Sequence, residues 1–413
     1  MDKMIVGRTE KTGSSKARAV SEYLLIIALY YITGSAFSYT RYSTQITVFF
    51  LVTLCACLLT KSYHYALRRR VLIPFVTMSF FVLLVPLLFS DSIPTYIAII
   101  MQLASGLFCA AIISPESFKQ KYTNVIMVFA AISLVGYAIG LLRPSFALNF
   151  PVTIGDASVD YYNAGVYVFM RAKGYGSLVL MQRNAGICWE PGCYQTFLNI
   201  ALLFLLDEQQ KRPQKRFYLK FILLFITIVT TISTTGIIIL MLLLVIYFRV
   251  LTRELGRKWL FLPLVLAVSI AVYYLTPVRE ILLAKLGREF GTERTFWQRI
   301  SLNRLKYLFS DSGIPYVFGM SFSKWLTHGV SLWNSVIHSI LCLGIPFTMI
   351  HIRGYWKGSN FLVAKKGVLF LVMILCASSE TLFWRVFFNT IAFYGWIGYR
   401  EQDREESDEI CAY

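Results

Sequence analysis

Long apolar runs recur along the whole chain, and they restrict what it can fold into more than any other feature. The runs are about 16 to 22 residues long, close to the roughly 20 residues that a helix needs to cross the hydrocarbon core of a bilayer. Only 15% of the 413 residues are charged and 57% are hydrophobic, whereas a soluble domain is about one quarter charged. The pattern therefore predicts an all-α, polytopic integral membrane protein.

About twelve membrane-spanning helices are expected from these runs. Their approximate ranges are 21–38, 44–60, 71–89, 94–113, 121–142, 190–206, 217–233, 235–250, 258–276, 332–351, 367–384 and 386–399. The stretch 217–250 is too long for one helix, and the STTG sequence at 233–236 predicts a turn that divides it. We take 21–399 as a single membrane domain between a basic tail at 1–20 and a charged tail at 400–413.

The distribution of lysine and arginine predicts the orientation of the chain. Basic residues gather in the amino-terminal tail and in the loops at 61–70, 207–220, 249–258 and 353–366. The positive-inside rule places these loops, and with them both termini, in the cytoplasm. The net charge of +18 largely reflects these loops and does not require a nucleic-acid partner.

Two long loops, 143–189 and 277–331, then fall on the extracytoplasmic side. The second loop carries eight lysine and arginine residues against four acidic ones. Long loops can cross a membrane whatever their charge, so this excess does not contradict the orientation. It favours either amphipathic surface helices or an anionic ligand outside the cytoplasm.

The sequence QRNAGICWEPG, at 182–192, joins the first long loop to a predicted helix. Pro191 suits the first position of that helix, which would put Glu190 at the cap beside the positive end of the helix dipole. Arg183 would lie two turns earlier, and a guanidinium binds phosphate through a planar fork of donors. The alternative is that Arg183 and Glu190 only form an ion pair at the membrane interface.

The sequence GTERTFWQRISLNRLKYL, at 291–308, predicts an amphipathic helix on the outer leaflet with Trp297 as its interfacial anchor. Arg288, Arg294 and Arg299 would then lie at the level of lipid phosphates. They could serve a substrate headgroup or contact ordinary anionic lipids.

A third polar group lies in HGVSLWNSVIHSILCLGIP, at 328–346. Asn334 and His338 are one turn apart on one face of the predicted tenth span, and His328 precedes it. Polar groups at this depth usually face a bundle interior or a cavity. His338 is either a proton acceptor or a helix-packing residue, and Glu380 is a further charge of the same kind.

Taken in order, these pieces resemble the O-antigen polymerase and O-antigen ligase superfamily, the Wzy and WaaL type of envelope glycosyltransferase. The first resemblance is R-x-x-G followed by E-P. The second is the STTG turn, where members often have Ser-Arg-Gly. The third is an arginine, a tryptophan and a glycine in the outer loop, followed by an asparagine and a glycine ten residues later. The matching positions are Arg183, Gly186, Glu190, Pro191, Arg294, Trp297, Gly319, Asn334 and Gly344. The chain departs from the pattern in lacking an arginine in STTG and in having Trp333 where members have histidine.

The resemblance implies a GT-C-like membrane fold and a substrate carried on undecaprenyl pyrophosphate in the outer leaflet. Fixed arginines would stabilise the leaving pyrophosphate as its charge grows. The residues expected there are Arg183 and Arg294, supported by Arg288 and Arg299. The expected bases are His328, Glu190 and His338, in that order, and Asn334 and His338 are expected to contact substrate. Because arginine replaces a divalent ion in this role, we expect neither metal nor cofactor.

Three functions compete at this stage. The favoured one is polymerisation of lipid-linked oligosaccharide repeat units into O-antigen, capsular or exopolysaccharide at the outer face of the cytoplasmic membrane. A ligase would instead transfer the glycan to a lipid or protein acceptor. A flippase would carry its basic residues inside the bundle, whereas here they lie in outer loops. The expected partners are the lipid-linked oligosaccharide and membrane lipid. A flippase and a chain-length regulator of the same pathway are further candidate partners.

Overall fold

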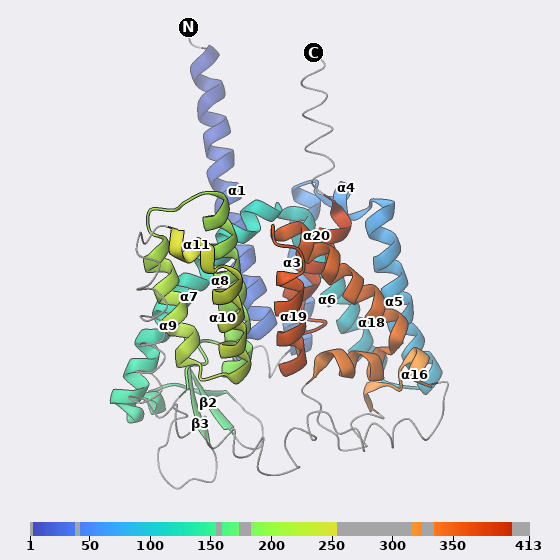
Figure 1. Cartoon of the computed structure of the whole chain (residues 1–413). Coiled ribbons are helices and arrows are strands. Elements are labelled where there is room, and N and C mark those ends of the chain that lie inside the picture. The colour runs from blue at the N-terminus through green and yellow to red at the C-terminus, as the bar shows by residue number, and fades with distance from the viewer. Residues whose placement is uncertain are drawn as a thin grey trace.

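A computed structural model describes residues 3–37, 42–153, 159–172, 183–253, 315–323 and 334–398. Long helices form the body of the molecule, and a small sheet lies below one end of it (Figure 1). The helices before the sheet are α1 (Lys3–Gly34), α3 (Tyr42–Leu59), α4 (Tyr63–Ala66), α5 (Arg69–Phe89), α6 (Ile93–Ile112), α7 (Pro115–Leu142) and the 3-10 helix η1 (Pro144–Asn149). The helices after it are α8 (Pro191–Lys211), α9 (Phe217–Thr230), α10 (Thr234–Ile246), α11 (Phe248–Arg253), α16 (Pro315–Phe318), α18 (Ser335–Leu362), α19 (Val368–Ser379) and α20 (Val386–Ile397).

Several of these helices are long and apolar enough to cross a membrane. Four of them in the described residues meet both criteria, namely α5, α6, α7 and α18. Shorter apolar helices accompany them, including α9, α10, α19 and α20. The chain is thus a membrane-embedded helical protein. The span expected at 258–276 lies outside the described residues.

The helical body has two ends that differ in what they carry. The start of α1 and the end of α20 lie at one end, which we call the termini end, and the sheet lies at the other, the sheet end (Figure 1). The turn expected within 217–250 is confirmed, because α9 ends at Thr230 and α10 begins at Thr234. Ser233 caps α10 by accepting a hydrogen bond from the Gly236 N–H at 3.4 Å.

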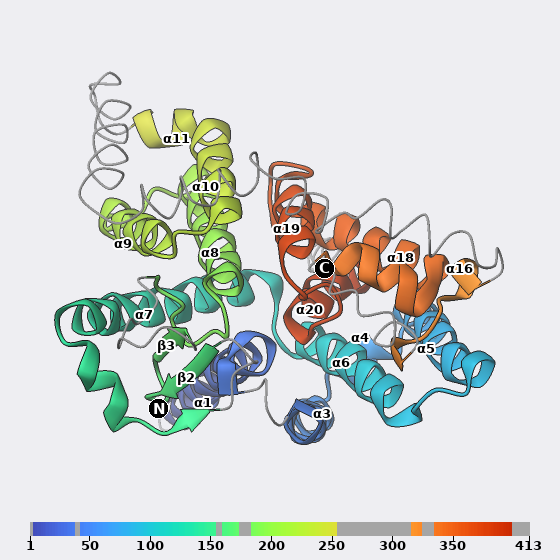
Figure 2. The same ribbon diagram turned by 90° about the horizontal axis from the view of Figure 1, so that it is seen from below.

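Helix α8 lies among α7, α9, α10 and α19 at the centre of one half of the body (Figure 2). Its residues are buried around its whole circumference between Cys193 and Asp207, which is typical of a core helix. Pro191 is its first residue and Glu190 its N-cap residue, as the sequence predicts. The first turn of α8 is therefore fixed from several sides at the sheet end.

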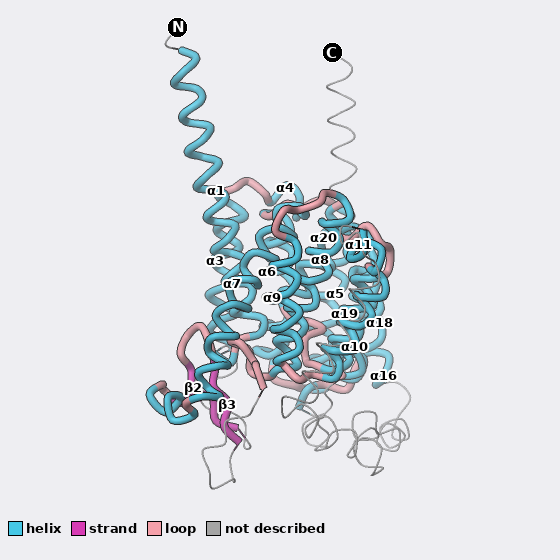
Figure 3. Tube along the Cα trace, turned by 60° about the vertical axis from the view of Figure 1, so that its left-hand side comes forward, coloured by secondary structure: helices cyan, strands magenta, loops and turns pink. Residues whose placement is uncertain are grey.

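The loop expected at 143–189 contains a three-stranded antiparallel sheet, which the all-α prediction missed. Its strands are β1 (Val152–Thr153), β2 (Val159–Asn163) and β3 (Val168–Ala172), in that order across the sheet. Figure 3 shows the strands beyond the end of the helices. Tyr162, Tyr167 and Phe169 form a small apolar cluster with η1, so the sheet has its own core.

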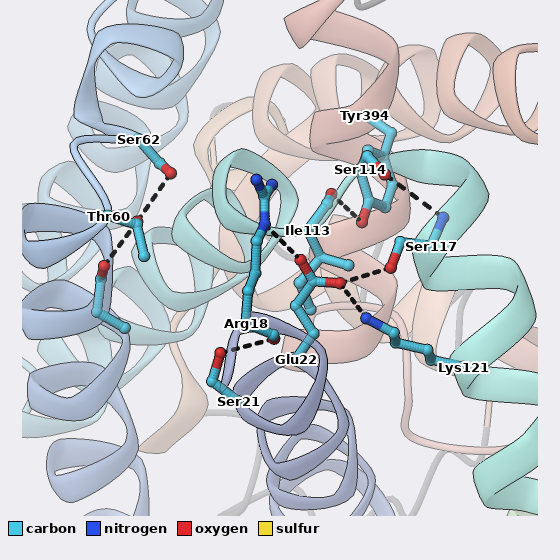
Figure 4. Close-up of polar contacts among 11 residues, drawn as sticks. Arg18, Ser21, Glu22, Thr60, Ser62, Ile113, Ser114, Ser117, Lys121 and Tyr394 are labelled. Carbon is cyan, nitrogen blue, oxygen red and sulfur yellow. Dashed lines mark hydrogen bonds and ion pairs between the residues drawn. The ribbon is translucent and has the colours of Figure 1, made fainter. Parts of the chain in front are cut away.

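At the termini end, a carboxylate from α1 ties this helix to α7. Glu22 accepts hydrogen bonds from Arg18 of its own helix and from Ser117 and Lys121 of α7 (Figure 4). A partly buried carboxylate with three donors is well compensated. Its interactions are therefore explained by helix packing.

Candidate functional site at the sheet end

The segment 183–190 enters the helical body as buried, non-helical chain. Asn184 is fully buried, and its side-chain N–H groups donate to Ser133 Oγ of α7 and Thr230 Oγ1 of α9, both at 3.1 Å. Its side-chain oxygen accepts from the Gly186 N–H at 3.0 Å. Because a buried amide needs its partners, Asn184 fixes the path of the chain. Our sequence analysis did not single it out.

Arg183 lies where this segment meets the turn between α9 and α10. Its Nε donates to the Thr231 carbonyl at 3.1 Å. Burial lowers the pKa of the Arg183 guanidinium, and the charges of Glu190 and Glu380 act in the opposite direction. The neighbouring Ile232 has a φ of +49°, a strained conformation for a β-branched residue, and such strain is often found at functional sites.

Glu380, from the carboxyl end of α19, lies at the first turn of α8. A Cβ built on Gly192 would be 1.8 Å from Glu380 Oε1, so the carboxylate lies directly against this glycine. Glu380 is 4% exposed. Glu190 is the backbone N-cap residue, but its carboxylate does not cap the first turn of α8. The positive end of this helix is therefore adjacent to a carboxylate that is distant in sequence.

Helix α18 contacts the turn that carries Glu380 through Ser335, its first residue. The Ser335 hydroxyl is 2.7 Å from both the Ala377 and the Glu380 carbonyl oxygens. It also accepts from the Phe383 N–H at 3.2 Å. These contacts hold the turn between α19 and α20 against the start of α18, so the position of Glu380 is set by two helices.

Arg385 completes the cluster from the start of α20. Its guanidinium lies over the Trp189 ring, 5.5 Å from the centroid, within the range of a cation–π contact. No sequence motif singled out Arg385. The cation–π contact joins the α19–α20 turn to the segment that precedes α8.

Asn334, expected to contact substrate, is the N-cap residue of α18. Its side-chain oxygen accepts from the Val336 and Ile337 N–H groups, each at 3.1 Å. This accounts for an asparagine here, because its side chain pairs donors that a helix start leaves unpaired. Substrate contact by Asn334 stays a prediction.

His338 lies one turn further along α18, between two aromatic rings. Its ring centroid is 5.7 Å from that of Phe322 and 5.2 Å from that of Trp384. Packing of this kind agrees with the helix-packing alternative. Among the described candidates for a base, Glu190 is partly exposed, whereas both ring nitrogens of His338 are buried, so Glu190 is better placed to meet a substrate.

Four other predicted site residues, namely Arg288, Arg294, Arg299 and His328, lie outside the described residues. Within the described ones, Glu190 and Glu380 lie close enough to Arg183 to act on its charge, and Glu380 and Arg385 both lie close enough to act on Cys193 in the first turn of α8. We call Arg183, Glu190, Glu380 and Arg385 the sheet-end cluster. Its two arginines balance its two carboxylates, so it combines donors for an oxyanion with candidate proton acceptors.

Among the residues that the structure describes, no three His, Cys, Asp or Glu side chains are grouped as a metal site would require. No protein-family model, curated protein or solved structure matches the chain. The function must therefore be inferred from the sequence and from the geometry of the sheet-end cluster.

Proposed function

We propose that the chain is a membrane glycosyltransferase that polymerises oligosaccharide repeat units carried on undecaprenyl pyrophosphate. The observation that carries the proposal is the sheet-end cluster. Transfer from a sugar pyrophosphate needs stabilisation of the leaving anion, and the attacking hydroxyl needs a proton acceptor. A cluster of arginines and carboxylates at the end of a membrane-embedded body supplies both kinds of group.

The roles within the cluster follow from its geometry. Arg183 is held by the Thr231 carbonyl through Nε, which leaves its terminal nitrogens as the donors to offer a pyrophosphate oxygen. Glu190 is the proposed proton acceptor for the incoming sugar hydroxyl. Glu380 is 4% exposed. This burial suits a role in neutralising the arginines of the cluster better than a role as proton acceptor.

The orientation of the chain in the membrane belongs to the same proposal. At the termini end, the connection from α3 to α5 carries Lys61 and Arg68, and the connection from α8 to α9 carries Arg212, Lys215 and Arg216. The positive-inside rule places this end in the cytoplasm. The sheet end would then face outward, where the lipid-linked substrate is used, and twelve spans would bring both termini to the cytoplasm.

The experiment compares glycan length in cells that lack the chain and are complemented with variants at matched protein levels. Arg183→Ala should leave lipid-linked single repeats in place of long glycan, and Glu190→Gln should shorten the glycan. Arg212→Ala is the matched control, because Arg212 is an exposed arginine at the opposite end of α8. Normal glycan in each of the two single variants, Arg183→Ala and Glu190→Gln, would overturn the catalytic assignment.

The location and length of the accumulating glycan separate the three functions considered above. Single repeats on the outer leaflet support a polymerase. Long glycan that stays on the lipid carrier would instead indicate a ligase. Single repeats confined to the inner leaflet would indicate a flippase, and either of these last two outcomes would refute the proposal.

A further inference from the structure

Residues 315–323, which we call the strap, lie across α5, α6 and α18 at the sheet end. The strap begins with α16, which packs against α18 and α5 (Figures 1 and 2). In sequence it comes after the stretch that contains Arg288, Arg294 and Arg299, which lies outside the described residues.

Two glycines allow the strap to lie against a break in α18. Gly319 and Gly344 have φ values of +88° and +86°, which glycine adopts without the steric cost of a Cβ. A Cβ on Gly319 would be 2.7 Å from the Cys342 carbonyl oxygen, and one on Gly344 would be 2.6 Å from the Val317 carbonyl oxygen. Both glycines are needed for the two backbones to approach this closely.

A backbone hydrogen bond joins the strap to α18 at this break. The Met320 N–H donates to the Leu341 carbonyl at 2.6 Å. A helix carbonyl becomes available to an outside donor where the regular ladder is interrupted, and the non-helical Gly344 provides that interruption. The middle of the strap is thus fixed by its backbone.

The end of the strap is held by Asp91, in the turn between α5 and α6. The Asp91 carboxylate accepts from the Tyr96 hydroxyl at 2.7 Å, from the Ser323 N–H at 3.2 Å and from the Ser323 hydroxyl. The Tyr96 oxygen also accepts from the Phe322 N–H at 3.3 Å. Hydrogen bonds to an ionised carboxylate are about twice as strong as neutral ones, so Asp91 is the main polar anchor of the strap.

Phe322 connects this anchor with the sheet-end cluster. Its ring centroid is 5.7 Å from that of His338 and 6.1 Å from that of Trp384. Trp384 directly precedes Arg385, whose guanidinium lies over Trp189. A continuous series of contacts therefore runs from Asp91 through Phe322 to the turn that positions Glu380 and Arg385.

We propose that Asp91 is a positioning residue, which fastens the strap and through Phe322 holds His338 and the α19–α20 turn in place beside the cluster. The fastening follows from the hydrogen bonds alone. Its effect on catalysis rests on the proposed transferase function.

The fastening is tested by hydrogen exchange on the purified full-length chain. In Asp91→Ala, the amides of Phe322 and Ser323 should exchange at least tenfold faster, because the acceptors that hold them are lost or displaced. Asp91→Asn keeps an acceptor and should restore part of the protection. Ser92→Ala is the matched control in the same turn, because Ser92 does not cap α6 through its side chain. Equal exchange in Asp91→Ala and Ser92→Ala would overturn the proposal.

The positioning role is tested by the rate of glycan extension at matched protein level and unchanged thermal stability. Asp91→Ala should lower the turnover rate severalfold, whereas the apparent substrate affinity should change much less. Asp91→Asn should restore part of the turnover rate. Faster exchange with a normal turnover rate would refute positioning while leaving the fastening intact. If Arg183→Ala also makes normal glycan, the proposed function fails, and the exchange result still decides whether Asp91 fastens the strap.

Discussion

Replacing Gly192 with alanine should destabilise the chain, and the sign of this effect tests the geometry of the cluster. Gly192 is helical, and at such a position alanine is ordinarily favoured over glycine by about 0.5–1 kcal/mol. Here the new Cβ would be 1.8 Å from Glu380 Oε1 and 2.9 Å from its Cδ. Overpacking of this kind costs about 1–3 kcal/mol. The contact therefore outweighs the propensity, and we expect a net loss of up to about 2.5 kcal/mol.

Removing the Glu380 side chain should remove the destabilising effect of Gly192→Ala or reverse its sign. In a Glu380→Ala background the new Cβ has no carboxylate to meet, so Gly192→Ala should be neutral or stabilising by up to about 1 kcal/mol. Two residues in contact commonly show coupling of about 0.5–3 kcal/mol in a double-mutant cycle. A Glu190→Ala background is the control, because that carboxylate does not lie against Gly192 and its removal should not relieve the loss.

Thermal unfolding can be followed with a thiol-reactive dye, because Cys188, Cys193, Cys342 and Cys376 are free and buried. For a chain of 413 residues, 1 kcal/mol corresponds to about 1 °C in the unfolding temperature, on the entropy per residue of globular proteins. Replicate melts must therefore resolve about half a degree. An equal loss in the Glu380→Ala and Glu190→Ala backgrounds would refute the placement of Glu380.

Three further predictions concern the elements around the cluster. Asn334→Ala should lower the free energy of unfolding by about 0.5–2 kcal/mol through loss of the α18 cap, and Asn334→Asp should retain most of it, as measured by the same melts. Gly344→Ala should cost at least about 1–3 kcal/mol, because the residue has φ +86° and ψ 167° inside α18, and the yield of folded protein should fall. Burial acts to raise the pKa of Asp91, but hydrogen bonds from Ser323 and Tyr96 outweigh it and lower the pKa. Its stabilisation is then fully present above the unfolded value of about 3.9 and is lost only as the pH falls through the lower folded pKa. Asp91 therefore stays ionised between about pH 8 and pH 5, and the protection of the strap amides against exchange should not change over this range.

Local sequence signals predicted the helices well where they acted alone. Pro191 marks the start of α8, and STTG marks the turn before α10, as expected. Helix lengths were less predictable, because α7 begins at Pro115 rather than at 121. Ser114 caps it by accepting from the Ser117 N–H, and this polar first turn lies outside the apolar run that defined the predicted span.

The sheet was missed because its strands are too short to produce a strong periodic signal. Strand β2 has only five residues, and its sequence VDYYN alternates only partly. The strand gains its stability from pairing, as in Tyr161 with Met170, and from the cluster around Phe169. Such non-local packing decides strand formation more than local propensity does.

The composition of the cluster was only partly accessible to sequence reasoning. Arg183 and Glu190 are close in sequence, so their proximity could be predicted. Glu380 reaches them only because Ser335 fastens the α19–α20 turn to α18 and because Gly192 leaves room for its carboxylate. A glycine in the first turn of an otherwise well-formed helix was the available signal, since it marks a close approach by another group.

The balance of charge in the cluster determines what a single arginine substitution can prove. Arg183→Ala would leave Glu190 and the buried Glu380 with less compensation, and an uncompensated buried charge is itself destabilising. Loss of glycan in that variant could then arise from repulsion within the cluster. The double variant Arg183→Ala with Glu190→Gln removes one charge of each sign and restores the balance. If Arg183 acts on the pyrophosphate, the double variant should recover thermal stability but make shorter glycan than Glu190→Gln alone. Glycan as long as that of Glu190→Gln alone would show instead that Arg183 serves only to neutralise Glu190.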